Sequence, residues 1–210
     1  MPVRDPVTAE DVEAAVALAV TTLETVTDRD WGVPASGLDW TCWESVEHLA
    51  DDLFAYAGQL GTDRPPKDTY VPFGWEHRRP GGPALTVWVR PDGGTAGAQQ
   101  VVETCGALLA AMVRAAPAHR RGWHPYGVSD AEGFAAMGVV EVLVHLHDVG
   151  EALGAPVTPD PALCRRALDR LFPDAPQDAD PWATLLWATG RAALPGRDRL
   201  VEWRWDATVR

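Results

Sequence analysis

Isoleucine and asparagine are absent from this chain of 210 residues, and Lys67 is its only lysine. Lys and Arg together number 18 against 30 Asp and Glu, which gives a formal net charge of -12. Binding to nucleic acid depends on clustered basic side chains that neutralise phosphates, and the sequence has no such cluster. We therefore expect a small-molecule substrate and no nucleic-acid partner.

Uninterrupted apolar runs long enough to cross a bilayer, roughly 20 residues, are also missing. The acidic start MPVRDPVTAED lacks the basic and apolar regions of a signal peptide. We expect no membrane segment and a cytoplasmic location.

Cysteine is scarce, with only Cys42, Cys105 and Cys164, and no two of them have C-x-x-C spacing. An odd number of widely separated cysteines indicates neither a disulfide framework nor a zinc knuckle. Reduced thiols in the core are the simpler interpretation.

Hydrophobic residues make up 46% of the chain, which is ordinary for a folded protein, and the length suits one core. We expect a single, mainly α domain over residues 1–210. Its core bundle spans about 8–154 and a C-terminal helical extension spans about 155–210.

Apolar residues at helical spacing predict four long helices. Capping boxes at Thr8 and Asp11, Thr41 and Glu44, and Ser129 and Glu132 mark three of their starts. The predicted ranges are 8–26, 41–61, 98–116 and 129–154, with two shorter helices at 161–172 and 181–193 opened by proline. Six prolines interrupt 61–97 and predict a long connection with short strands near 70–75 and 85–90. The tail LVEWRWD alternates like a strand.

Three polar residues share one face of the apolar fourth helix: Glu141, His145 and Asp148 stand at i, i+4 and i+7. Buried charges are normally paired or bound to metal, so this face is a candidate metal site. A glutamate and a histidine that simply bond to each other are the alternative. Asp148 either orients His145 or acts as a general base, and an exposed partner of His145 is the competing interpretation.

A metal site of the catalytic kind needs a third ligand from another helix, and His48 is the candidate. His48 lies roughly opposite the apolar stripe of its helix, so periodicity alone favours a solvated face. The functional alternative is that this polar face lines the mouth of the bundle.

Two segments resemble signatures of the mycothiol-dependent maleylpyruvate isomerase family and its DinB-like relatives. Trp40-Thr41 followed by His48-Leu49 is similar to the first, and Glu141-x-x-x-His145-x-x-Asp148 before Ala-Leu-Gly is similar to the second. The resemblance covers roughly residues 8–154, with the middle loop poorly matched. It implies an actinobacterial-type, DinB-like four-helix bundle.

The resemblance also implies a divalent metal, best assigned as zinc, held by His48, Glu141 and His145, with Asp148 as a catalytic acid beside them. Nickel, iron or cobalt suit the same ligands. A thiol such as mycothiol or bacillithiol is the implied cosubstrate, for S-transfer or isomerisation. Maleylpyruvate isomerases proper are expected to add a C-terminal α/β domain, for which residues 155–210 are too few. A metal-dependent hydrolase and a non-catalytic binding bundle therefore stay open, as does homodimerisation.

Two further groups are candidates for a role near the site. The residues Trp123, His124, Pro125 and Tyr126 either line a pocket or serve as hinge packing. Arg191 either binds an anion of an acidic substrate or bonds the last carbonyls of its helix.

Overall fold

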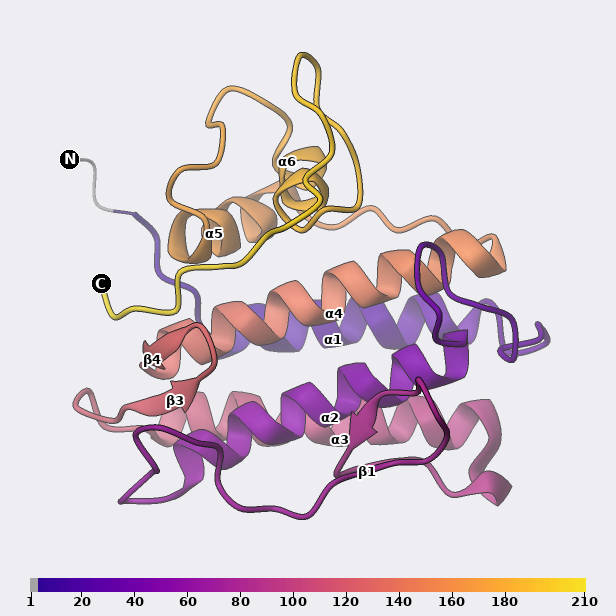
Figure 1. The fold of residues 1–210 in the computed structure, drawn as a ribbon, viewed down its shortest axis with the longest axis horizontal. Helices are drawn as coiled ribbons and strands as arrows, with labels where there is room; N and C mark the ends of the chain where they lie inside the picture. Colours follow the sequence, from indigo (N-terminus) through magenta and orange to yellow (C-terminus); the bar gives the residue numbers. More distant parts are fainter. Residues whose placement is uncertain (1–3) are drawn as a thin grey trace.

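The computed structural model describes residues 4–210, and six α-helices provide most of the regular structure in that range (Figure 1). They are α1 (Ala9–Glu24), α2 (Cys42–Gly61), α3 (Gly94–Ala115), α4 (Ala131–Leu153), α5 (Pro161–Leu171) and α6 (Pro181–Ala188). A single 3-10 turn, η1 (Pro91–Gly93), precedes α3. The predicted mainly α fold is confirmed.

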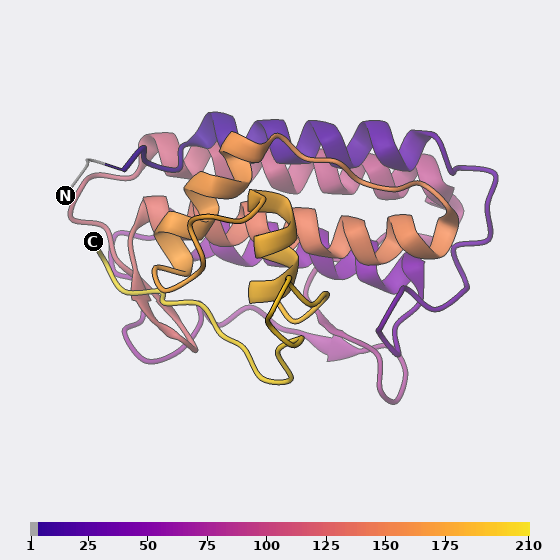
Figure 2. The ribbon, with the colours of Figure 1, turned by 90° about the horizontal axis from the view of Figure 1, so that it is seen from above.

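The four long helices lie side by side, as both views show (Figures 1 and 2). Helices α1 and α2 each pack against both α3 and α4. Seventeen of the 23 residues of α4 are buried, so a polar side chain on this helix has protein around it rather than water.

The start of α4 differs from the predicted capping box. Asp130 is the N-cap, and its carboxylate accepts a hydrogen bond from the Gly133 N–H at 2.9 Å. Glu132 instead accepts hydrogen bonds from Arg4 and the backbone of Val7. The prediction of a box at Ser129 and Glu132 was wrong, because the N-terminal segment offers Glu132 a charged donor that a local box cannot match.

The connection between α2 and α3 holds one antiparallel pair, β1 (Glu76–His77) and β2 (Ala84–Leu85), with Glu76 opposite Leu85. The strand predicted near 70–75 is absent from the described structure, and the one near 85–90 is reduced to its first residue. Backbone N–H groups of Thr86 and Val87 donate to the Asp51 carboxylate at 2.8 and 2.7 Å. The buried Asp51 carboxylate on α2 thus accepts the hydrogen bonds that a partner strand would otherwise accept.

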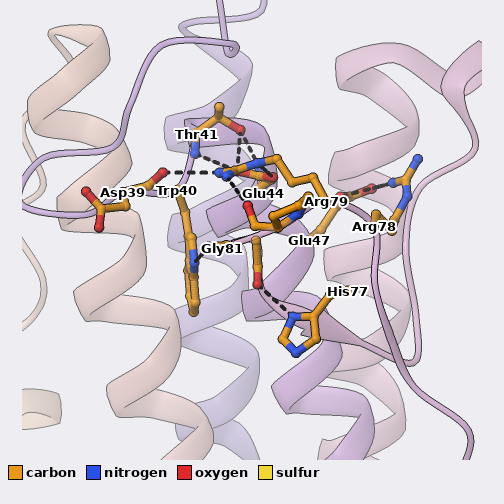
Figure 3. Close-up of polar contacts among 11 residues, drawn as sticks. Asp39, Trp40, Thr41, Glu44, Glu47, His77, Arg78, Arg79 and Gly81 are labelled. Carbon is orange, nitrogen blue, oxygen red and sulfur yellow. Dashed lines mark hydrogen bonds and ion pairs between the residues drawn. The ribbon is translucent and has the colours of Figure 1, made fainter.

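Side chains of the same connection fasten it to the first turns of α2 (Figure 3). Arg79 bridges to Glu44 with a nitrogen–oxygen distance of 2.6 Å, while Glu44 also completes the predicted capping box with Thr41. The Trp40 indole N–H donates to the Gly81 carbonyl at 3.1 Å. Trp40 is thereby fixed on the loop that leads into α2.

The C-terminal segment covers α4 on the side away from α2 and α3 (Figure 1). Helix α5 packs on α4, and α6 packs on α5. Helix α6 ends at Ala188 rather than at 193, since Gly190 adopts a positive φ of 68°. The tail at 200–206 forms no strand in the described structure, so that prediction was wrong. A hairpin of β3 (Gly122–His124) and β4 (Gly127–Ser129) was not predicted.

Two helices are long and apolar enough to cross a membrane by length and composition, Pro91–Ala115 and Ala131–Leu153. The apolar window of Ala131–Leu153 is 89% buried, because this is the core helix of the bundle. The window of Pro91–Ala115 is 33% buried. The core helices of soluble proteins can be equally long and apolar, so length and composition alone do not indicate a membrane span.

Candidate metal centre

Four side chains from two helices meet in one cluster. His48 and Asp52 come from α2, and Glu141 and His145 come from α4. One nitrogen or oxygen atom of each lies within 4.8 Å of the others. The structure thus brings the three predicted ligand residues together and adds Asp52, which was not among the predicted ligands.

The same spacing on each helix builds the cluster. On α2, His48 Nε2 lies 3.2 Å from Asp52 Oδ2, and on α4, His145 Nε2 lies 3.2 Å from Glu141 Oε2. Both pairs are at i, i+4, which places their side chains on one helix face. Because α2 packs against α4, the two faces meet, with 5.0 Å between the His48 and His145 ring centroids.

The interpretation of the His48 face as solvated was wrong. The His48 side chain is only 22% exposed. The Trp40 ring covers it edge-on at a centroid distance of 4.7 Å, and the same indole stacks on His145 at 6.4 Å. The periodic pattern of α2 reports its most apolar side and does not reveal that Trp40 and α4 cover the opposite one.

The electrostatics of the cluster suit metal ligation. Burial lowers the pKa of His48 to about 4, and the neighbouring His145 ring contributes to this shift. His48 is therefore neutral at pH 7, as a metal ligand must be. Burial raises the pKa of Asp52 well above its ordinary value, and the charges of Glu141 and Asp51 act in the same direction. Burial would also raise the pKa of Glu141, but contact with His145 holds it below its ordinary value.

The donor set fits a divalent cation. Two carboxylates and two imidazoles are ligands of zinc and of related transition metals. Without a cation, the carboxylates of Asp52 and Glu141 repel each other in a partly buried site, where their side chains are 19% and 12% exposed. Within residues 4–210, the buried Nδ1 atoms of His48 and His145 have no hydrogen-bond partner, while their Nε2 atoms lie 3.2 Å from the Asp52 and Glu141 carboxylates.

Asp148 is buried beside the cluster, with 2% of the residue exposed. Its Oδ2 lies 3.6 Å from His145 Nδ1 and accepts a hydrogen bond from Arg191 at 2.9 Å. The interpretation of Asp148 as an exposed partner of His145 was wrong. Arg191 does bind an anion, but the anion is Asp148, and the same guanidinium also donates to the Thr189 carbonyl at 2.9 Å.

The residues around 123–126 form the β3–β4 hairpin rather than a lining of the cluster. His124 is buried against Tyr56, Tyr126 and Trp205. Tyr126 and Trp205 line a pocket of about 890 Å³ on the C-terminal segment, and this pocket includes none of the four cluster residues. The hinge-packing interpretation describes His124 better than the pocket interpretation does.

A pocket of about 580 Å³ reaches the cluster at Asp52 and Tyr56. The Tyr56 hydroxyl donates to Glu141 Oε1 at 3.4 Å, and burial raises its pKa well above the ordinary value, so it stays protonated. Sequence reasoning did not identify Asp52 or Tyr56 as site residues. The signal was present, since His48, Asp52 and Tyr56 stand at i, i+4 and i+8 along α2.

A family model described as the mycothiol maleylpyruvate isomerase N-terminal domain matches residues 12–150. That range contains all four residues of the cluster, together with Tyr56 and Asp148, and it ends before Arg191. No curated protein and no solved structure matches the chain.

Proposed function

The chain belongs to the family of the mycothiol maleylpyruvate isomerase N-terminal domain, and from this premise we propose that it is a metal-dependent enzyme acting on a small molecule with a mycothiol-type thiol. S-transfer or isomerisation is the proposed reaction class. The observation that carries the proposal is the cluster of His48, Asp52, Glu141 and His145 within the matched range. The proposal includes one domain over residues 1–210, because buried side chains from the bundle and the C-terminal segment form one core cluster. It also includes a cytoplasmic location.

His48, Glu141 and His145 are the proposed metal ligands, with Asp52 as a fourth donor that a substrate group can displace. Zinc is the best-suited ion, and nickel, iron or cobalt suit the same donors. Held by these residues, a divalent metal would lower the pKa of a coordinated thiol, and this would supply a nucleophile at neutral pH.

The surrounding residues hold these donors in place and partly cover them. Tyr56 holds Glu141 by its hydrogen bond of 3.4 Å, and Trp40 covers both imidazoles. Asp148 lies beside Nδ1 of His145, the position from which a carboxylate orients a ligating histidine. Its pairing with Arg191 favours this orienting role over that of a general base, because a base must be free to take a proton.

The test is an assay of purified protein with mycothiol and a panel of electrophilic acceptors, with added zinc and after chelation. We expect thiol consumption that requires both the metal and the protein, and that is lost in Glu141→Ala. A hydrolase with the same open site would turn over ester or amide substrates without thiol. Stoichiometric metal with no thiol-dependent turnover across the panel would contradict the proposed reaction and leave a non-catalytic bundle.

A further inference from the structure

The pocket that includes Asp52 and Tyr56 is lined mainly by aromatic and apolar side chains. It lies between α2 and the connection that follows it, with a volume of about 580 Å³. Its aromatic residues are Phe54, Tyr56, Tyr70, Phe73 and Trp75. Volumes and linings of this kind are typical of small-molecule sites.

Three of these aromatic residues are unusually exposed. Tyr70 is 40% exposed, Phe73 45% and Trp75 66%. They follow one another along a segment of the connection that has no regular secondary structure. Clustered exposed aromatic groups mark a binding surface, because they leave apolar area in water that a ligand can cover.

Glycine in α2 shapes the wall of the pocket. A Cβ added at Gly58 would lie 2.8 Å from Phe73 Cε2, so this glycine lets Phe73 rest directly on the helix. The Phe73 ring also contacts Phe54, with centroids 5.1 Å apart. The connection is therefore seated on α2, and its aromatic side chains line the same pocket as Asp52.

The charges of the lining are all negative. Asp51 and Asp52 are the charged residues of the pocket, and no Lys, Arg or His of residues 4–210 lines it. Asp51 is occupied by the backbone N–H groups of Thr86 and Val87. Apart from the metal ion proposed at Asp52, a carboxylate ligand would find no cationic partner in this lining, and it would meet the like charge of Asp51.

Resting on the proposed function, we propose that this pocket binds an uncharged, aromatic part of the small-molecule substrate and disfavours carboxylates. The cluster at the inner end then meets the reacting group, while the aromatic side chains hold the rest. Arg191 and Arg199 line another pocket, of about 560 Å³, on the side of Asp148, so they do not supply a counter-charge in this one.

The test compares benzyl mercaptan with 4-(mercaptomethyl)benzoate, which differ by one carboxylate, by calorimetric titration of the zinc-loaded protein. We expect the neutral thiol to bind about tenfold more tightly or better. Trp75→Ala and Phe73→Ala should each weaken its binding about threefold or more. Trp88→Ala is the matched control, because Trp88 is an exposed aromatic residue of the same connection outside the pocket.

Three results would overturn the proposal: equal or tighter binding of the carboxylate compound, no binding of either thiol, or equal affinity in the Trp75, Phe73 and Trp88 variants. The same titrations on metal-free protein separate the two proposals. We expect weaker binding there with the neutral preference kept, because the preference comes from the lining. If the protein holds no zinc, the proposed function fails. The metal-free titrations alone then test whether the pocket prefers the neutral thiol.

Discussion

Arg191 and Asp148 form a buried ion pair that ties the segment after α6 to α4. The guanidinium donates to both carboxylate oxygens, at 2.9 and 3.4 Å. Asp148 in turn lies 3.6 Å from Nδ1 of His145, so the C-terminal segment reaches the candidate metal centre through a single carboxylate. The pair therefore links the stability of that segment to the position of one proposed ligand.

Replacement of Arg191 by methionine should destabilise the protein by about 3 kcal/mol, because it leaves the Asp148 carboxylate buried without its partner. Urea unfolding at pH 7 measures this change. Arg90→Ala is the control, since Arg90 pairs with Asp92 in full exposure and should change the free energy of unfolding by less than about 0.5 kcal/mol. Equal losses in the two variants would show that the buried pair contributes nothing specific.

His124 should make the folded state sensitive to mild acid. Burial lowers its pKa to about 4, and its Nδ1 accepts a hydrogen bond from the Tyr126 N–H, which requires the neutral ring. An unfolded histidine titrates near 6.5, so the unfolded state binds the proton first and stability falls as the pH drops from about 6.5 towards 4. Between pH 7 and pH 5 the wild type should lose about 2 kcal/mol more than His124→Gln. The same pH dependence in both proteins would contradict this role.

Gly106 should mark the closest approach of α1 and α3. A Cβ there would lie 2.5 Å from Val16 Cγ2, so Gly106→Ala should destabilise the bundle by about 1–3 kcal/mol through overpacking. Gly97 in the same helix meets only an ordinary contact of 3.6 Å with Val89, so Gly97→Ala should stabilise by about 0.5–1 kcal/mol. Thermal unfolding of the two variants should shift in opposite directions, and a shift in the same direction would contradict the packing.

Asp52→Asn tests whether the cluster has a fourth donor. The change should weaken zinc binding by about 10- to 100-fold, because an amide is a poorer ligand than a carboxylate and the site loses one negative charge. Asp51→Asn is the matched control, since Asp51 accepts from backbone N–H groups outside the cluster and an amide oxygen can do the same. Competition with a chromophoric chelator measures both. Equal affinities would leave the site with three protein ligands.

Much of the bundle could be predicted from local patterns, because apolar spacing and the Thr41 cap act within one helix. The connection could not be predicted in this way. A strand was predicted near residues 85–90, but the N–H groups of Thr86 and Val87 donate to the Asp51 carboxylate and that of Val89 to Glu47. Only the folded chain defines these partners. Propensity reports what a segment prefers in isolation, and buried acceptors elsewhere override it.

The candidate metal centre, too, could be predicted only in part from the sequence. The spacing of Glu141 and His145 indicated one half of it, whereas His48 was chosen on family resemblance against its own periodicity. The link between Arg191 and Asp148 spans 43 residues, and no pattern in the sequence connects the two. Contacts between distant elements arise from packing, so their partners become visible only in three dimensions.

Metal content is the measurement that tests the central claim most directly. Protein purified after growth with zinc should carry about one zinc per chain by mass spectrometry of the digested sample. The double variant His48→Ala, His145→Ala should carry almost none, while His147→Ala should match the wild type, because His147 lies on the same helix but contacts Trp182 instead of the cluster. Equal, near-zero metal in the wild type and the double variant would contradict the metal centre and the enzyme proposed from it.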